Sequence, residues 1–209
     1  MIDGRLQRGE RTRLAVLDAA VALASVEGLE GFSLARLAQN RGVSKAGLFA
    51  HWPSKQQLQL AIVERAQEQW VEFIVQPALK ESSAVRQLWA LHEKRLGFYE
   101  KGVLPGGCFF ATVGAELADR PGPISDAIAS ANEKWMDLLV AIARRAIKTR
   151  ELRAETNPEQ LGFEIQALGE AVIVHTHLLH RDRSYQYARR AVLDRLRHLS
   201  TDPHILPES

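Results

Sequence analysis

The chain has 209 residues, of which 46% are hydrophobic and 25% are charged, a composition typical of globular proteins and unlike that of disordered segments. Its single cysteine, Cys108, excludes an intrachain disulfide and favours a reducing, cytoplasmic setting. No run of about 18 apolar residues is present, so we expect no membrane span. The first residues lack the apolar segment of a signal peptide.

The net charge of +2 is unevenly distributed along the chain. The first sixty residues carry eight basic and five acidic side chains, a net charge of +3, whereas the remainder has a net charge of −1. A polyanion would therefore bind at the N-terminal part, although a bias this small supports other observations and does not stand alone.

Helical periodicity runs through the whole chain, and the alternation typical of strands is nearly absent. Gly28 and Gly42 mark helix ends, Pro77 is expected to end the fourth helix, and the tail after Ser200 is expected to fray. The sequence thus predicts an all-α fold of about nine helices, over residues 10–26, 33–40, 44–51, 54–76, 84–101, 108–118, 124–146, 157–180 and 184–199.

Two short predicted helices flank Gly42, a residue that takes a positive φ without penalty. Leu37 and Leu48 are apolar where these helices would close on each other. The second helix is slim, with small residues at 46, 47 and 50, and it has a basic residue, Lys45, near its start. A helix of this kind enters the DNA major groove, which is about 12 Å wide, and presents its N-terminal residues to base edges. The pattern predicts a helix-turn-helix.

The stretch Gly42-Val43-Ser44-Lys45-x-Gly47-Leu48-Phe49-x-His51-Trp52-x-Ser54-Lys55 closely resembles the motif G-V-S-x-x-x-L-Y-x-H-F-x-S-K of the TetR family of regulators. The resemblance extends from about Arg11 to Leu60. It implies a helix-turn-helix DNA-binding domain of three helices over residues 1–53 and a helical ligand-binding and dimerisation domain over residues 54–209.

The resemblance also implies roles for individual residues. Ser33 would bond a phosphate at a helix start, Lys45 would reach a base edge, and Phe49 replaces a tyrosine, keeping its packing and losing its hydroxyl. Trp52 is expected in the core. Arg36 is added for its expected exposure. The predicted DNA contacts are Ser33, Arg36, Ser44, Lys45, Gly47, Phe49, His51 and Lys55.

In TetR-like proteins the C-terminal domain dimerises and holds a small-molecule pocket. Small residues such as Ala167, Gly169 and Ala171 suit a homodimer interface built by the last two helices, although intrachain packing explains some of them equally well. Aromatic residues at helical spacing suit either core or an apolar cavity for a small apolar or aromatic ligand. The pocket candidates are Trp70, Phe73, Trp89, Phe98, Phe109, Thr112, Glu116 and Trp135.

No catalytic motif stands out, and the spacing of His175, His177 and His180 does not suit a metal, so we expect neither enzyme nor metal nor cofactor. The leading hypothesis is a homodimeric repressor that releases a palindromic operator, a double-stranded DNA, when it binds a small molecule. A regulator that binds DNA without any ligand, and a helical binding protein or enzyme that does not bind DNA, remain the alternatives.

Overall fold

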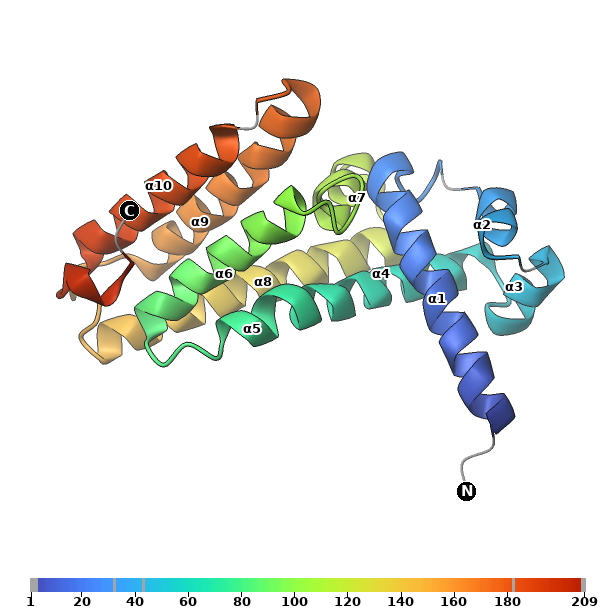
Figure 1. Cartoon of the computed structure of the whole chain (residues 1–209), viewed down its shortest axis with the longest axis horizontal. Coiled ribbons are helices and arrows are strands. Elements are labelled where there is room, and N and C mark those ends of the chain that lie inside the picture. Colours follow the sequence, from blue (N-terminus) through green and yellow to red (C-terminus); the bar gives the residue numbers. More distant parts are fainter. Residues whose placement is uncertain (1–3, 32, 43, 182, 208–209) are drawn as a thin grey trace. The chain divides into compact units, whose positions relative to one another are not determined.

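A computed structural model describes residues 4–31, 33–42, 44–181 and 183–207. Apart from an isolated bridge between Leu152 and Ser200, these residues form helices, turns and loops and no strand (Figure 1). The helices are α1 (Gly4–Glu27), α2 (Leu34–Arg41), α3 (Lys45–His51), α4 (Lys55–Trp70), α5 (Gln76–Ala78), α6 (Ala84–Glu100), α7 (Phe109–Leu117), α8 (Pro123–Lys148), α9 (Pro158–Ile173) and α10 (Arg183–Leu199). The all-α prediction is confirmed.

Two π-helical turns and one 3₁₀ turn complete this set: η1 (Val71–Val75), η2 (Val174–Leu178) and η3 (Pro203–Ile205). Since α4, η1 and α5 follow one another without a break, the described residues form nine α-helical segments, as predicted.

The chain divides into two compact units, which are described separately. Unit 1 comprises Met1–Glu68 and Leu104–Ser130, and unit 2 comprises Gln69–Val103 and Ala131–Ser209. The predicted boundary at residue 53 separates a DNA-binding domain from a ligand-binding and dimerisation domain. It is a boundary between functions, and it stays a prediction.

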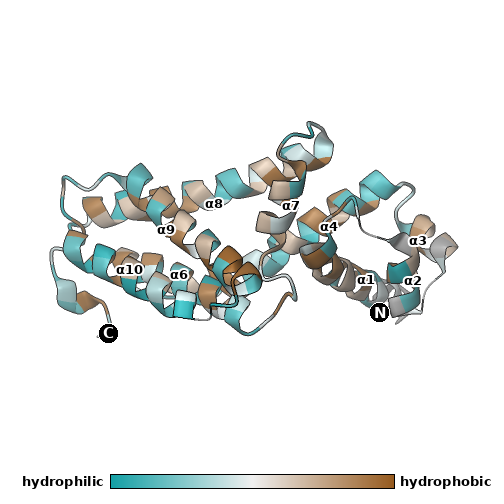
Figure 2. Ribbon diagram, turned by 90° about the horizontal axis from the view of Figure 1, so that it is seen from above, coloured by the Kyte–Doolittle hydropathy of each residue, from teal (hydrophilic) through white to brown (hydrophobic). Residues whose placement is uncertain are grey.

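Unit 1 is built around α1, whose apolar stretch is brown in Figure 2. Val16, Leu17, Ala20 and Val21 are buried at steps of one, three and four residues, as expected for one face of a helix. Gly28, in the left-handed region with φ of 74°, ends α1 as predicted. On α4, Arg65 bonds Asp18 of α1 at 2.7 Å and so ties these helices together.

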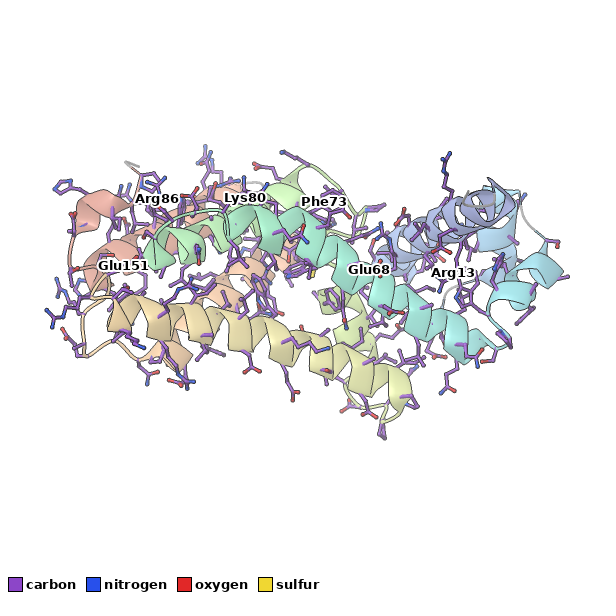
Figure 3. The ribbon with its side chains drawn as sticks, turned by 90° about the horizontal axis from the view of Figure 1, so that it is seen from below. Arg13, Glu68, Phe73, Lys80, Arg86 and Glu151 are labelled. Carbon is purple, nitrogen blue, oxygen red and sulfur yellow. The ribbon has the colours of Figure 1, made fainter. Side chains whose placement is uncertain are left out.

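Unit 2 packs α6 against α9 and α10, which lie side by side in Figure 1. The start of α6 is held by Glu151, whose carboxylate accepts from the Ser83 hydroxyl at 2.6 Å and from the Val85 N–H at 3.0 Å (Figure 3). Burial opposes ionisation of Glu151, but these hydrogen bonds outweigh it and hold the pKa of the carboxyl below its ordinary value.

Two expectations about the fourth helix are wrong: that Pro77 ends it, and that Phe73 can be a core residue. The π-helical turn η1 explains both. Pro77 does not end the helix, which continues to Ala78, because the wider turn shifts the hydrogen bonds: the Gln76 N–H donates to Val71 O, five residues back. The same shift changes which residue faces the core. Phe73 is 45% exposed, and its neighbour Ile74 is fully buried.

The prediction of a frayed tail after Ser200 is also wrong. The Thr201 N–H donates to Glu151 O at 3.0 Å, and Leu206 is buried. The tail packs because it carries an apolar residue that unit 2 covers.

Candidate nucleic-acid interface

The two short helices α2 and α3 begin and end as local sequence dictates. Ser33 caps α2 by accepting from the Arg36 N–H at 3.3 Å, and Ser44 caps α3 by accepting from the Gly47 N–H at 3.0 Å. Gly42 closes α2 in the left-handed region with φ of 62°, the conformation for which glycine was invoked. The predicted helix end at Gly42 therefore forms, while Val43, the next residue of the predicted turn, lies outside the described residues.

One face of this helix pair is apolar and buried. Leu37, Ala38, Leu48 and Trp52 are all buried, which confirms the core role expected for Trp52. The guanidinium of Arg13, on α1, lies over the Trp52 ring at 5.7 Å from its centroid (Figure 3 labels Arg13). Packing and this cation–π contact fix the end of α3 on α1.

Several of the predicted contacts are exposed. They are Arg36 on α2, Phe49 and His51 on α3, and Lys55 at the start of α4. Phe49 is 44% exposed, so its side chain is only partly covered, and the packing role expected for its ring stays a prediction. The side chain of Lys45 lies outside the described part of the structure.

Two of these exposed cations are paired with acids at the end of α1. Arg36 forms an ion pair with Glu27, and the Lys55 ammonium lies 3.9 Å from a Glu30 carboxylate oxygen. Exposed ion pairs contribute little stability, about 0–1 kcal/mol, so either cation can exchange its carboxylate for a phosphate. Sequence reasoning missed these acids because their partners are set by the fold.

In unit 2, some predicted pocket residues do come together. The Trp70 ring meets the Trp135 ring edge-on at 5.3 Å between centroids and the Phe98 ring at 6.3 Å. Phe73 lies 6.0 Å from Phe98 despite its exposure. These four residues form an aromatic cluster, built from helices that are far apart in the sequence.

Arg95, a residue that sequence reasoning missed, is buried among these rings. Its guanidinium carbon lies 5.8 Å from the Trp70 ring and 5.9 Å from the Trp135 ring. Its Nε donates to the Tyr99 hydroxyl at 2.7 Å, and Nη1 donates to Gln166 Oε1 at 2.9 Å. Hydrogen bonds and cation–π contacts thus stabilise the positive charge of Arg95, a residue that is only 1% exposed.

The small residue Gly169 makes room for this arginine, since a Cβ there would lie 2.4 Å from Arg95 Nη1. Gly169 therefore serves packing within the chain, and the interface role considered for it is not needed. Its buried neighbours Leu161, Ile165 and Val172 are likewise intrachain core.

The other pocket candidates lie elsewhere. Trp89 lines a separate pocket of about 470 Å³ in unit 2 with Glu93, Arg189 and other residues. Phe109, Thr112 and Glu116 belong to unit 1, where Phe109 is 1% exposed and packs on Phe110. No single site within either unit contains all eight predicted residues.

Two further searches cover the described residues only. None of their helices is long and apolar enough to cross a membrane. Among them, no three His, Cys, Asp or Glu side chains gather as metal ligands would.

Comparison with known proteins places both halves of the chain in one family. Residues 16–62 match the family of bacterial regulatory proteins named tetR, and residues 84–192 match the tetracyclin repressor-like C-terminal domain. No curated protein matches the chain significantly.

Many solved structures share the fold. A TetR transcriptional regulator from Chloroflexus aurantiacus has a TM-score of 0.82 at 23% identity, over 89% of this chain and 94% of that one. A TetR family regulator from Cytophaga hutchinsonii has a TM-score of 0.82 at 18% identity, over 93% and 98%. AibR, solved with isovaleryl coenzyme A and operator DNA, has a TM-score of 0.69 at 22% identity, over 87% and 96%.

Proposed function

Because the chain belongs to the TetR family of bacterial transcriptional regulators, we propose that it is a ligand-responsive repressor that binds a palindromic operator as a homodimer. The observation that carries this proposal is the α2–α3 pair. It buries Leu37 and Leu48, and it leaves cationic and aromatic side chains exposed.

The exposed side chains suggest how DNA would be held. The Ser33 oxygen accepts the Arg36 N–H, so its own hydroxyl hydrogen is available to a phosphate. His51 and Lys55 would also contact phosphates. The Phe49 side chain, which lacks a hydroxyl and is partly exposed, suits apolar contact with a thymine methyl in the major groove. Lys45, Ser44 and Gly47 would lie at the base edges.

The proposed ligand region is the aromatic cluster of unit 2, formed by Trp70, Phe73, Phe98 and Trp135. Support comes from the relative AibR, which was solved with both a ligand and operator DNA. Rings around the buried Arg95 guanidinium favour a small apolar or aromatic ligand with one polar group. Four candidates are not included in this proposal, because Trp89 lines another pocket of unit 2 and Phe109, Thr112 and Glu116 belong to unit 1.

The proposed dimer uses α9 and α10. Phe163 on α9 is 61% exposed and Tyr187 on α10 is 65% exposed, and near the end of α9 Val174 and Leu178 are exposed as well. Large apolar side chains in the open on two adjacent helices are typical of a protein interface. Neither catalysis nor a cofactor is part of this proposal, and DNA binding would place the protein in the cytoplasm.

A selection from random duplexes tests the DNA-binding part. We expect the full chain to enrich a palindrome. Lys45→Ala and Lys55→Ala should each weaken binding, and Lys55→Ala should also reduce the slope of log affinity against log salt by about one phosphate contact. Lys80→Ala is the matched control, because Lys80 is exposed in unit 2 and should leave DNA affinity unchanged. Failure to enrich any duplex at modest salt would favour a helical binding protein or enzyme that reads no DNA.

A further inference from the structure

The turn that follows α1 is built to hold a carboxylate. After Gly28, the backbone N–H groups of Leu29 and Glu30 both point to one side chain, Glu116 of α7. The Leu29 N–H donates to Oε2 at 2.6 Å and the Glu30 N–H to Oε1 at 3.0 Å. Consecutive amides next to a left-handed residue form a concave anion-binding site, and here the protein's own carboxylate fills it.

Gly28 is required at this turn for two reasons. Its φ of 74° is unfavourable for other residues, and a Cβ there would lie 2.4 Å from a carboxylate oxygen of Glu116. The glycine that ends α1 therefore also admits the Glu116 side chain. These two hydrogen bonds join the turn to a residue of α7 that is 86 to 87 positions further along the sequence.

More bonds attach α7 and the loop before it to the end of α1. The Thr112 hydroxyl donates to Ser25 O at 3.0 Å, and the Gly106 N–H donates to the Ser25 hydroxyl at 3.1 Å. From α4, the Gln59 amide donates to Leu29 O at 3.0 Å. The end of α1 is thus held from both α7 and α4, within unit 1.

The held turn leads directly into the DNA-binding helices. Glu27, just before the turn, pairs with Arg36 of α2, and Glu30, within it, pairs with Lys55 of α4. The chain enters α2 within four residues of Glu30, so the turn sets where α2 begins.

We propose that Glu116 is a positioning residue for operator binding: it fixes the Gly28–Glu30 turn and so holds α2 and α3 in the arrangement that fits DNA. This inference rests on the proposed DNA-binding function. It assigns Glu116 and Thr112 to the positioning of the α2–α3 pair, in place of the ligand contacts expected from the sequence.

The position of α7 along the chain gives the proposal a regulatory meaning. The chain passes from unit 2 into unit 1 between Val103 and Leu104, and back into unit 2 after Ser130 within α8. Because α7 lies on the segment between these two junctions, a shift of the backbone at either junction would displace α7. The contact of the Glu116 carboxylate would then displace the α1–α2 turn as well.

The test compares Glu116→Gln with wild type on a selected duplex. Glutamine keeps the size but turns an NH₂ group toward one of the two backbone N–H groups, so at most one bond survives. If only a tenth of the molecules then hold the competent arrangement, the Kd rises about tenfold. The salt slope should stay at the wild-type value, because no phosphate contact is lost.

Controls separate this effect from unfolding and from direct contact. Asp119→Asn, an exposed carboxylate of unit 1, should leave the Kd unchanged. Lys55→Ala should change the salt slope. Each variant is measured at a temperature where circular dichroism shows it folded. If Glu116→Gln does not fold, Thr112→Val, which removes the hydroxyl that donates to Ser25 O and to Cys108 O at the start of its own helix, should raise the Kd by about threefold with the same slope.

The outcomes are distinguishable. A wild-type Kd for both Glu116→Gln and Thr112→Val, or a changed salt slope, overturns the positioning role while leaving the proposed function intact. Absence of any wild-type DNA binding overturns the proposed function and the positioning role together. Faster amide exchange of Leu29 and Glu30 in Glu116→Gln, in step with the raised Kd, is the expected result.

Discussion

His92 offers a sharp test of how unit 2 is packed. It lies on α6 with no exposed surface, its Nε2 bonds Ala188 O of α10 at 3.2 Å, and its Nδ1 is buried with no hydrogen-bond partner. Burial first, and then the positive charge of Arg95, lower the pKa of His92 from 6.5 to about 3. The imidazole is therefore neutral in the folded protein at pH 5 to 7.

The consequence for stability has a definite sign. Unfolding returns the His92 pKa to 6.5, so below that pH the unfolded chain binds a proton that the folded chain does not. Stability contributed by the neutral ring is complete above pH 6.5 and is lost as the pH falls toward 3. From pH 7 to pH 5, the loss in the free energy of unfolding is about 2 kcal/mol.

The assay is urea unfolding of wild type and His92→Gln at pH 7 and pH 5. Glutamine keeps a donor for Ala188 O but does not titrate. The carboxylates titrate alike in both proteins, so their contribution cancels when the two changes in the free energy of unfolding are compared. The wild type should lose about 2 kcal/mol more than the variant between the two pH values. An equal loss in both proteins would show that His92 is solvated, and that the α6–α10 contact described here is wrong.

Three further predictions follow from single contacts. Gly169→Ala should lower the free energy of unfolding by about 1–3 kcal/mol, because its Cβ overlaps Arg95; an unchanged melting temperature would refute that packing. Phe163→Glu should give monomers by sedimentation and weaken operator binding, and a variant that stays dimeric would move the interface away from α9. Gly28→Ala should destabilise by more than about 1 kcal/mol, through its positive φ and its overlap with Glu116, and a neutral result in thermal unfolding would contradict the turn geometry.

Local sequence was sufficient for the helix boundaries that depend on capping and on glycine. Ser33, Ser44 and Gly42 act within one turn of the chain, so their roles follow from residue type and spacing. Pro77 was predicted incorrectly, and Phe73 is exposed where a core position was one of its two expected roles, because a π turn changes the helical phase and no local signal marked it.

The roles that could not be predicted from the sequence belong to residues whose contacts lie far away along the chain. Nothing in the sequence distinguished Arg95 from the other helix cations, and only the fold encloses it with Trp70 and Trp135. Glu116 and Thr112 were recognised as polar residues one turn apart. Their partners lie more than 80 positions away, so the choice between a ligand and the end of α1 required the structure.

The central claim is that a dimer of this chain reads DNA with two copies of α3. Hydroxyl-radical footprinting of a selected duplex tests it directly. We expect two protected half-sites on one face of the duplex, with centres one helical turn apart, about 34–36 Å, or a multiple of that spacing. A single protected half-site, or uniform weak protection of any sequence, would contradict it.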